Sequence, residues 1–287
     1  MFLVELFVQG LIQGSVYALI AVGLTLVYGL LRILHVAHAG LFTLGGYAGV
    51  LVTNATGSVA VALVFAALSV GAVGMAVYRF CYEPILRRPP YVALIASIGL
   101  FIAMEELFRI VFGPFGLTYD IVPLQGSVVI GGMYLRSAEL VTMALAAVLI
   151  GGLGLLAGRT RIGLAWRATV SVPEMAESFG IDIVKVRYLN FFIGSALAGV
   201  AGVMVSVLNN LVEPTMGSVA SYKALAIIVL GGLGNVRGTL VAALTLGVIE
   251  AYGTIYLAGF LDRDAIAFAV LIVILMVRPQ GLFGRSA

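Results

Sequence analysis

The chain has 287 residues, of which 62% are hydrophobic and only 10% are charged, and its formal net charge is +3. A soluble domain carries about 25% charged residues, so this chain has too few charges to cover a water-facing surface and is expected to lie in a membrane. The small net charge argues against nucleic-acid binding, and the single cysteine, Cys81, excludes an intrachain disulfide.

Apolar runs occur along the whole chain, and a membrane-spanning helix needs about 20 mostly apolar residues. Runs of this length lie at 3–29, 58–80, 91–113, 139–158, 188–208 and 239–260. Shorter runs, which are expected to be tilted, broken or re-entrant, lie at 40–54, 222–234 and 264–279. The sequence therefore predicts an all-α polytopic integral membrane protein with about eight or nine transmembrane or re-entrant helices, forming one domain over residues 1–287.

Lysine and arginine are divided unevenly between the two sets of loops that such crossings create. One side is predicted to hold twelve of the sixteen: Arg32, Arg79, Arg87, Arg88, Arg159, Arg161, Arg167, Lys185, Arg187, Arg237, Arg278 and Arg285. The other side is predicted to hold four: Arg109, Arg136, Lys223 and Arg263. Because basic loops stay in the cytoplasm, the first side is predicted to be cytoplasmic, with the N-terminus outside and the C-terminus inside.

Two polar stretches stand out between the apolar runs. The stretch at 114–138 contains turn residues and predicts a short extracytoplasmic hairpin. The stretch at 159–187 falls on the predicted cytoplasmic side. Neither is long enough to form a separate soluble domain.

The cytoplasmic loop contains the sequence SVPEMAESFG, which predicts a short amphipathic helix. Ser171 is a candidate N-cap, Pro173 and Glu174 suit a first helical turn, and Gly180 is a typical helix stop. One interpretation is an interfacial loop that only orients the chain. The other is a docking element through which a soluble partner pushes on the membrane part.

Polar residues within the first span are candidates for a substrate path. Gln13, Tyr17 and Thr25 fall near helical spacing, so they line either a polar path or contacts with neighbouring helices. His38 is a candidate for the lining of a broken helix, where backbone groups are free to meet substrate, with structural packing as the alternative. By contrast, Gly194, Ala198 and Gly202 have the small-residue spacing typical of close helix packing.

The span at 91–113 contains two acids, and intramembrane acids are functional candidates by default. Glu105 lies four residues before Arg109, so this pair can neutralise itself on one helix face. Glu106 is expected to lack such a partner, which makes it the stronger candidate for the substrate path.

Motifs for nucleotide binding, catalysis and metal binding are missing from the sequence. The chain has only two lysines, Lys185 and Lys223, and neither follows a phosphate-binding glycine-rich loop. His35 and His38 have no further metal ligand nearby in the sequence. We therefore expect no enzymatic activity, no ATPase site, no metal and no cofactor.

Three stretches resemble one known family. They are IQGSVYALIAVGLTLVYGLLRILHVAHAGLFTLGGYAG near the start, RATVSVPEMAESFGIDIVKVRYLNFFIGSALAGVAGVM in the middle, and VEPTMGSVASYKALAIIVLGGLGNVRGTLVAALTLGVIE further on. Together they resemble the branched-chain amino acid permeases of ATP-binding cassette (ABC) transporters. The chain departs from the family's usual pattern at Ala37–Gly40, where an acid is missing, and at Glu105 and Glu106, where neutral polar residues are usual.

The resemblance implies the permease fold and function of an ABC importer. The cargo would be a branched-chain or other hydrophobic amino acid, moved across the inner (cytoplasmic) membrane with ATP hydrolysed in separate subunits. The expected partners are two cytoplasmic ATP-binding subunits, a second related permease subunit, an extracytoplasmic solute-binding protein and membrane lipid. The resemblance assigns the ATPase-coupling helix to Pro173, Glu174, Ala176, Glu177, Phe179 and Gly180.

Alternatives remain open at this point. A permease of the same family that carries urea or a short amide would share the same three stretches. An ion-driven secondary transporter would use an intramembrane acid such as Glu106 without ATP. A membrane-embedded enzyme would need a clustered catalytic set, which the sequence does not display.

Overall fold

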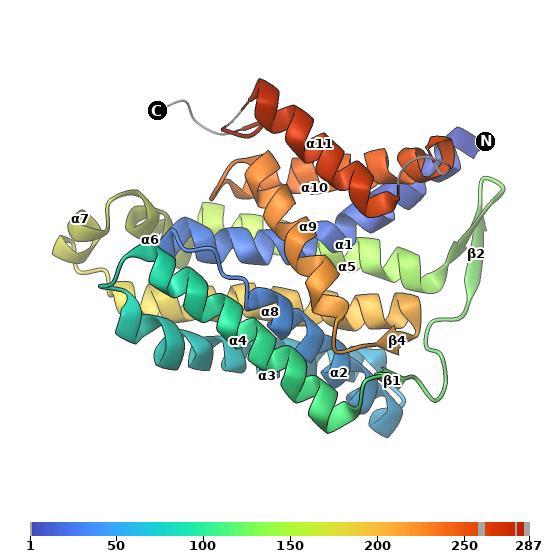
Figure 1. The fold of residues 1–287 in the computed structure, drawn as a ribbon, viewed down its shortest axis with the longest axis horizontal. Helices are drawn as coiled ribbons and strands as arrows, with labels where there is room; N and C mark the ends of the chain where they lie inside the picture. The colour runs from blue at the N-terminus through green and yellow to red at the C-terminus, as the bar shows by residue number, and fades with distance from the viewer. Residues whose placement is uncertain (1, 258–261, 279, 284–287) are drawn as a thin grey trace.

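The computed structural model describes residues 2–257, 262–278 and 280–283 and is built almost entirely of helices (Figure 1). The α-helices are α1 (Phe2–Leu31), α2 (His38–Thr56), α3 (Val59–Val77), α4 (Pro90–Phe112), α5 (Ser137–Arg159), α6 (Arg161–Ser171), α7 (Pro173–Ser178), α8 (Ile183–Asn209), α9 (Met216–Gly231), α10 (Val236–Tyr256) and α11 (Arg263–Val277). A π-helical turn, η1 (Tyr78–Tyr82), and a 3-10 turn, η2 (Glu83–Ile85), extend α3.

Each of the nine predicted apolar runs forms a helix. Among the described residues, six helical segments are long and apolar enough to cross a membrane by length and composition: α1, the α3–η2 segment, α4, α5, α8 and α10. The three short runs correspond to α2, α9 and α11, which have 19, 16 and 15 residues. The predicted all-α polytopic architecture is confirmed, and residues 258–260 and 279 of the predicted runs lie outside the described residues.

The predicted hairpin is also present, at the end of the molecule where α1 begins (Figure 1). Strand β2 (Ser127–Ile130) pairs antiparallel with β3 (Met133–Arg136). A second pairing joins β1 (Leu117–Thr118) to β4 (Leu211–Val212), which follows α8. In the described part of the chain, α6 and α7 lie at the opposite end, so the hairpin end and the α7 end define the long axis of the helix bundle.

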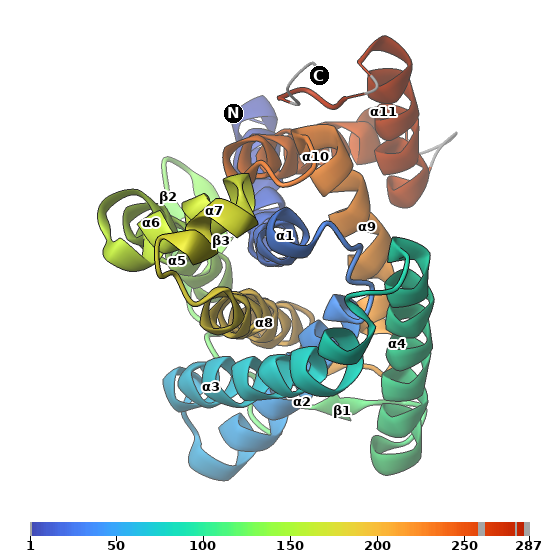
Figure 2. The ribbon, with the colours of Figure 1, turned by 90° about the vertical axis from the view of Figure 1, so that its left-hand side faces the viewer.

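Helix α1 forms the centre of the bundle. Figure 2, viewed from the α7 end, shows α5, α8, α9 and α10 around it. Most of its residues are buried, and Ala18, Leu19 and Val22 have no exposed surface. Because α1 is apolar on all faces, it is suited to a position surrounded by other helices.

Close contacts between helix backbones hold this arrangement together. A Cβ atom on Gly10 of α1 would lie 2.6 Å from Val248 Cα of α10. On α8, a Cβ atom on Gly194 would lie 2.9 Å from Gly23 O, and one on Gly202 would lie 2.0 Å from Phe42 O. The predicted packing role of the small residues in α8 is therefore confirmed, since any larger side chain would separate the helices.

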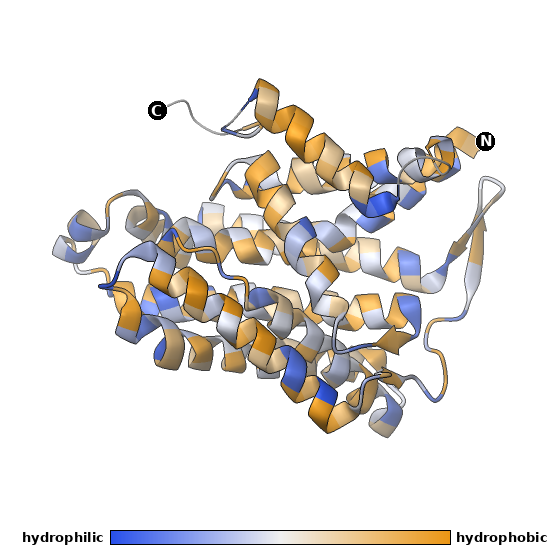
Figure 3. Cartoon of the chain, in the orientation of Figure 1, coloured by the Kyte–Doolittle hydropathy of each residue, from blue (hydrophilic) through white to orange (hydrophobic). Residues whose placement is uncertain are grey.

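Hydrophobic residues occupy much of the length of the helices (Figure 3), and many of them lie on the outside of the bundle. Large apolar side chains point outward from α3, α4 and α5; Leu68 is 58% exposed, Ile95 is 65% exposed and Val148 is 69% exposed. A soluble protein rarely leaves such a continuous apolar surface open to solvent. Lipid is the environment that this surface fits.

The predicted grouping of basic residues agrees with the positions of three of them at the α7 end and fails at Lys223. Arg159, Arg161 and Lys185 all lie where α5, α6 and α8 meet at the α7 end. Lys223, which was placed on the other side at the start of the apolar run 222–234, is instead buried in the middle of α9. The error arose because α9 begins at Met216, several residues before the apolar run that was used to place it. Arg285 lies outside the described residues.

Candidate functional site

The loop at 159–187 folds into two helices that project from the end of the bundle (Figure 1). Helix α6 begins at Arg161, and the Thr160 hydroxyl caps it by accepting a 3.1 Å hydrogen bond from Gly163 N. Helix α7 follows after Val172, with Pro173 in its first turn. Ser171 was the expected N-cap of α7, but this was wrong: Ser171 is the last residue of α6, and Val172 caps α7 without a side-chain hydrogen bond.

The end of α7 follows the prediction. Gly180 has a φ of +83°, the left-handed conformation that glycine adopts without steric cost. Gly180 N donates to Glu177 O at 2.9 Å, and Ile181 N donates to Ala176 O at 3.0 Å. These two bonds form a Schellman motif, which ends the helix and turns the chain toward α8.

The side chains of α7 divide into an inner and an outer set. Ala176 is only 3% exposed and faces the rest of the protein. Met175 and Phe179 are 57% and 81% exposed, and Glu174 and Glu177 are exposed beside them. A six-residue helix that exposes a large aromatic side chain next to two acids has an apolar anchor with a polar rim, the arrangement of a protein-binding element.

A cavity of about 380 Å³ lies next to this loop, between α5, α6 and α8. Its lining includes Ile162 and Trp166 of α6, Leu189 of α8, and Gly180. The loop is therefore not packed tightly against the bundle along this side.

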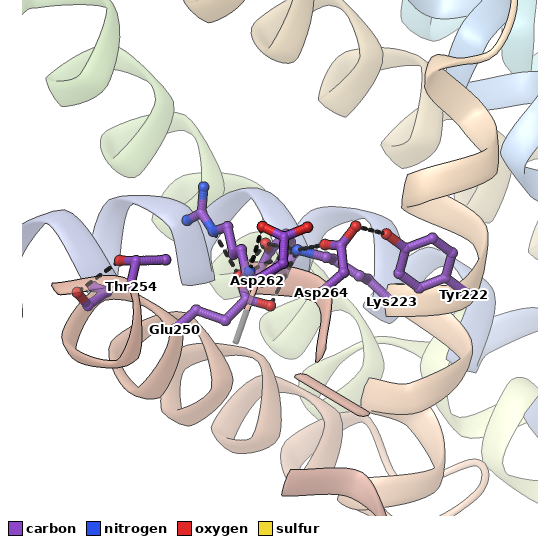
Figure 4. Close-up of polar contacts among 9 residues, drawn as sticks. Tyr222, Lys223, Glu250, Thr254, Asp262 and Asp264 are labelled. Atoms are coloured by element: carbon purple, nitrogen blue, oxygen red, sulfur yellow. Dashed lines mark hydrogen bonds and ion pairs between the residues drawn. The ribbon is translucent and has the colours of Figure 1, made fainter. Parts of the chain in front are cut away.

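Deep in the bundle, α1, α9, α10 and α11 meet at a cluster of charged residues that the sequence analysis missed (Figure 4). Lys223 Nζ lies 3.1 Å from Glu250 Oε1 and 3.0 Å from Asp264 Oδ1. Arg263 Nε lies 2.9 Å from Glu250 Oε2. We call Tyr17, Lys223, Glu250, Arg263 and Asp264 the ionic cluster; its two formal positive and two formal negative charges cancel.

Tyr17 connects α1 to the ionic cluster. Its hydroxyl donates to Glu250 Oε2 at 2.6 Å and accepts from Lys223 Nζ at 2.8 Å. Tyr222, next to Lys223, adds a hydrogen bond to Asp264. The side chains of Glu250 and Lys223 are 0% and 4% exposed, so their charges depend on one another for stabilisation.

The other predicted path residues of α1 lie at different places. Thr25 is buried, and its hydroxyl is 2.8 Å from the hydroxyl of Thr239 on α10. Gln13 is half-buried and lines a cleft at the hairpin end. Gln13, Tyr17 and Thr25 therefore lie at three different features: the cleft, the ionic cluster and a helix–helix contact, in that order.

His38 and Glu106, the other two candidates for the substrate path, do not lie on α1. His38 is the first residue of α2, is 2% exposed, and has its Nε2 3.2 Å from Ile20 O. The expectation that Glu106 lacks an intrahelical partner was wrong, because Arg109 Nη1 lies 2.8 Å from Glu106 Oε1. The Glu106 side chain is 51% exposed.

A connection without helical structure, residues 32–37, joins α1 to α2 and places a second histidine in the interior. His35 is fully buried, and its Nδ1 is 2.6 Å from the Tyr82 hydroxyl of η1. Among the described residues there is no group of three or more His, Cys, Asp or Glu side chains that could hold a metal.

The ionic cluster did leave a signal in the sequence. Lys223, Glu250 and Asp264 all lie inside predicted apolar runs, and charges of opposite sign in separate spans are expected to pair. Their partners could not be assigned without knowing which helices are neighbours.

These features define a multi-pass membrane protein with a projecting helical loop at one end. Residues 6–277 match the family model described as "Branched-chain amino acid transport system / permease component". The chain belongs to this family, and it is a permease subunit of an ABC importer. The sequence resemblance is thereby confirmed.

Individual relatives support the assignment over the whole chain. The high-affinity branched-chain amino acid transport system permease protein LivH of Escherichia coli (strain K12) is 33% identical, over 99% of this chain and 96% of the relative. BraD of Pseudomonas aeruginosa, another such permease protein, is 32% identical over 97% of this chain and 94% of the relative. LivM of Escherichia coli (strain K12) is 27% identical over 93% of this chain and 67% of the relative. No solved structure matches the chain.

Proposed function

We propose that the chain carries branched-chain or other hydrophobic amino acids inward across the inner (cytoplasmic) membrane. The support is the similarity of this chain, over nearly its full length, to LivH and BraD, both high-affinity branched-chain amino acid transport permeases. The energy comes from ATP hydrolysed by separate subunits, and the chain itself performs no chemistry.

The transporter is proposed to contain two different permease subunits. LivM, also a permease protein of a high-affinity branched-chain amino acid system, is similar to this chain over 93% of its length. A related chain of the same fold is therefore a suitable second half for the membrane path. Two cytoplasmic ATP-binding subunits and an extracytoplasmic solute-binding protein complete the assembly.

The observation that carries the proposal is the exposure of Phe179 and Met175 on the projecting helix α7. We place the α7 end in the cytoplasm because most basic residues lie there, so the N-terminus faces out and the C-terminus faces in. Pro173, Glu174, Glu177 and Phe179 form the outer face of α7 for an ATP-binding subunit, while Ala176 and Gly180 hold the helix in position. Closure of the two ATP-binding subunits then moves α7 and shifts the permease pair between its outward-facing and inward-facing states.

The test is reconstitution of the complete transporter in proteoliposomes, with ATP-dependent leucine uptake as the readout. Phe179→Ala is expected to weaken the binding of the ATP-binding subunit to α7 by about 30-fold, since removal of a central aromatic anchor costs about 2 kcal/mol or more. Phe80→Ala is the matched control, because Phe80 is 78% exposed on η1, outside the projecting loop. Full uptake by Phe179→Ala would contradict the docking role.

The same assay separates the alternative cargoes and driving forces. Urea and short amides are added as competitors of leucine uptake; competition by urea but not by valine or isoleucine would favour the urea or amide permease. Uptake that follows an ion gradient in the absence of ATP would favour a secondary transporter.

A further inference from the structure

We infer that a cleft at the hairpin end of this chain binds the free amino acid as a zwitterion, through paired charges beside an apolar wall. The cleft has a volume of about 620 Å³ and is lined by residues 6–16 of α1, the starts of α5 and α11 and the last turns of α8 and α10. Small-molecule pockets of about 300–1,000 Å³ are typical, so a single amino acid fits with room for water. This inference rests on the proposed function and adds a substrate site to it.

Two arginines, each held by an acid, supply the charges of the cleft. Arg136 Nε donates to Glu139 Oε1 at 3.0 Å, and Arg136 Nη1 donates to Leu208 O at 3.2 Å. Arg263 contacts Glu250 through Nε, at 2.9 Å. A guanidinium has five N–H donors, so the terminal nitrogens of Arg263 can bind an α-carboxylate while Nε stays on Glu250.

The charge balance selects the class of ligand. The Arg136–Glu139 pair and the ionic cluster behind Arg263 are each neutral overall. A ligand with net charge would bring a charge for which these neutral groups hold no spare opposite charge, which makes its binding less favourable. A zwitterion brings one charge of each sign, so its carboxylate faces a guanidinium while its ammonium faces amide and carboxylate oxygens.

The lining of the cleft also includes apolar residues suited to an aliphatic side chain. Val16 of α1, Val205 of α8 and Ile255 of α10 contribute to its lining. Burial of a leucine or isoleucine side chain against such residues is favourable, because it removes apolar surface from water. The cleft therefore combines apolar recognition with a polar end, as a hydrophobic amino acid requires.

Polar side chains extend from the cleft to the ionic cluster along one face of α1. Gln9, Gln13 and Tyr17 are spaced four residues apart, so they lie one above another on that helix. Gln9 and Gln13 line the cleft, and Tyr17 belongs to the ionic cluster. Arg263 lines the cleft and also belongs to the ionic cluster, so a carboxylate bound by its terminal nitrogens would lie beside that cluster.

The chain's single cysteine makes a direct test practical. Cys81 is replaced by alanine, Gln13→Cys is added, and the complete membrane complex is placed in lipid nanodiscs. The rate of modification by a charged methanethiosulfonate reagent is measured with and without leucine. Gln125→Cys, at an exposed position before β2, is the matched control, and Gln9→Cys is the second cleft variant if Gln13→Cys does not assemble.

Leucine at about ten times its half-protecting concentration is expected to slow the labelling of Gln13→Cys about tenfold, because about one site in ten then stays empty. It is expected to leave Gln125→Cys unchanged. Two analogues test the zwitterion requirement: 4-methylpentanoate lacks the ammonium group, and 3-methylbutylamine lacks the carboxylate. Neither is expected to protect at the same concentration.

Leucine uptake by the same complex separates the two proposals. Uptake without protection, protection by either singly charged analogue, or a Gln13→Cys thiol that is not labelled at all would overturn the cleft inference and leave the proposed function intact. Protection without uptake of any branched-chain amino acid would support the zwitterion site and overturn the proposed cargo. Protection by leucine alone, together with uptake, is the expected result.

Discussion

Lys223 of α9 and Glu250 of α10 form an ion pair inside the helix bundle, with Nζ 3.1 Å from Oε1 and with side chains that are 4% and 0% exposed. The pair does not stand alone, because Asp264 and Arg263 bring α11 into the same cluster. Charges on three helices are thereby neutralised by one another. Since lipid cannot solvate them, the cluster fixes which helices are neighbours.

Removal of one member of the pair is expected to destabilise the protein strongly. Lys223→Met leaves Glu250 buried with less compensating charge, which costs about 3–5 kcal/mol and lowers the apparent melting temperature by roughly 5–10 °C. The measurement is the temperature at which the detergent-purified protein loses its monodisperse peak on size-exclusion chromatography. The other lysine gives the control: Lys185 is 85% exposed and pairs with Asp182, so Lys185→Met is expected to change stability by less than about 1 kcal/mol. Equal effects at both lysines would contradict a stabilising role for burial of the pair.

The contact between α2 and α8 is expected to tolerate no added methyl group at Gly202. A Cβ atom there would lie 2.0 Å from Phe42 O and 2.8 Å from Gly46 N, so Gly202→Ala must push the two backbones apart. The expected cost is about 1–3 kcal/mol, measured by the same thermal assay. Gly151→Ala is the control, because no described atom lies within 4 Å of a Cβ atom at Gly151 of α5. The control is expected to be neutral or slightly stabilising, by up to about 1 kcal/mol; a comparable loss in both variants would point to a general intolerance of the glycines.

Much of the fold could be predicted from the sequence because the information is local. Apolar runs specify membrane helices wherever they pack, and Gly180 specifies a helix end through its own backbone freedom. Pairings between distant segments were out of reach, such as Leu117 with Val212 in the β1–β4 contact. Hydropathy also placed Lys223 wrongly, since the small and polar residues that open α9 continue the helix without extending the apolar run.

The candidate site was predictable to the same degree. Phe179 and Gly180 lie in a short helix at the expected place. The burial of Ala176 depends on the rotation of α7 against α6 and α8, which a six-residue sequence cannot specify. Tyr17 was a candidate for its polarity alone; its partners Lys223 and Glu250 lie on helices far along the chain.

Glu106 is expected to be dispensable for ATP-driven uptake. Its side chain is 51% exposed, and Arg109 keeps Glu105 as a partner, at 3.3 Å, when Glu106 is replaced. Such an exposed pair contributes about 0.2–1 kcal/mol, so Glu106→Gln is expected to retain uptake within about fivefold of the unmodified protein. Uptake is measured in proteoliposomes with and without an uncoupler of the proton gradient. Loss of uptake in Glu106→Gln, together with uncoupler sensitivity in the unmodified protein, would favour an ion-coupled mechanism instead.

Gly180 is expected to control the transfer of motion from α7 to α8, because its φ of +83° closes the Schellman motif between them. An alanine in this conformation costs about 1–2 kcal/mol, which lowers the population of the closed turn by about tenfold. Gly180→Ala is therefore expected to reduce ATP-dependent uptake while ATP hydrolysis by the complex continues. Gly180→Asn is the matched variant, since asparagine adopts the left-handed conformation more readily and is expected to retain more uptake. A Cβ atom at this position meets no described atom within 4 Å, so the difference between the two variants reports backbone conformation and not a steric clash. Equal uptake by Gly180→Ala and the unmodified protein would show that the turn does not limit coupling.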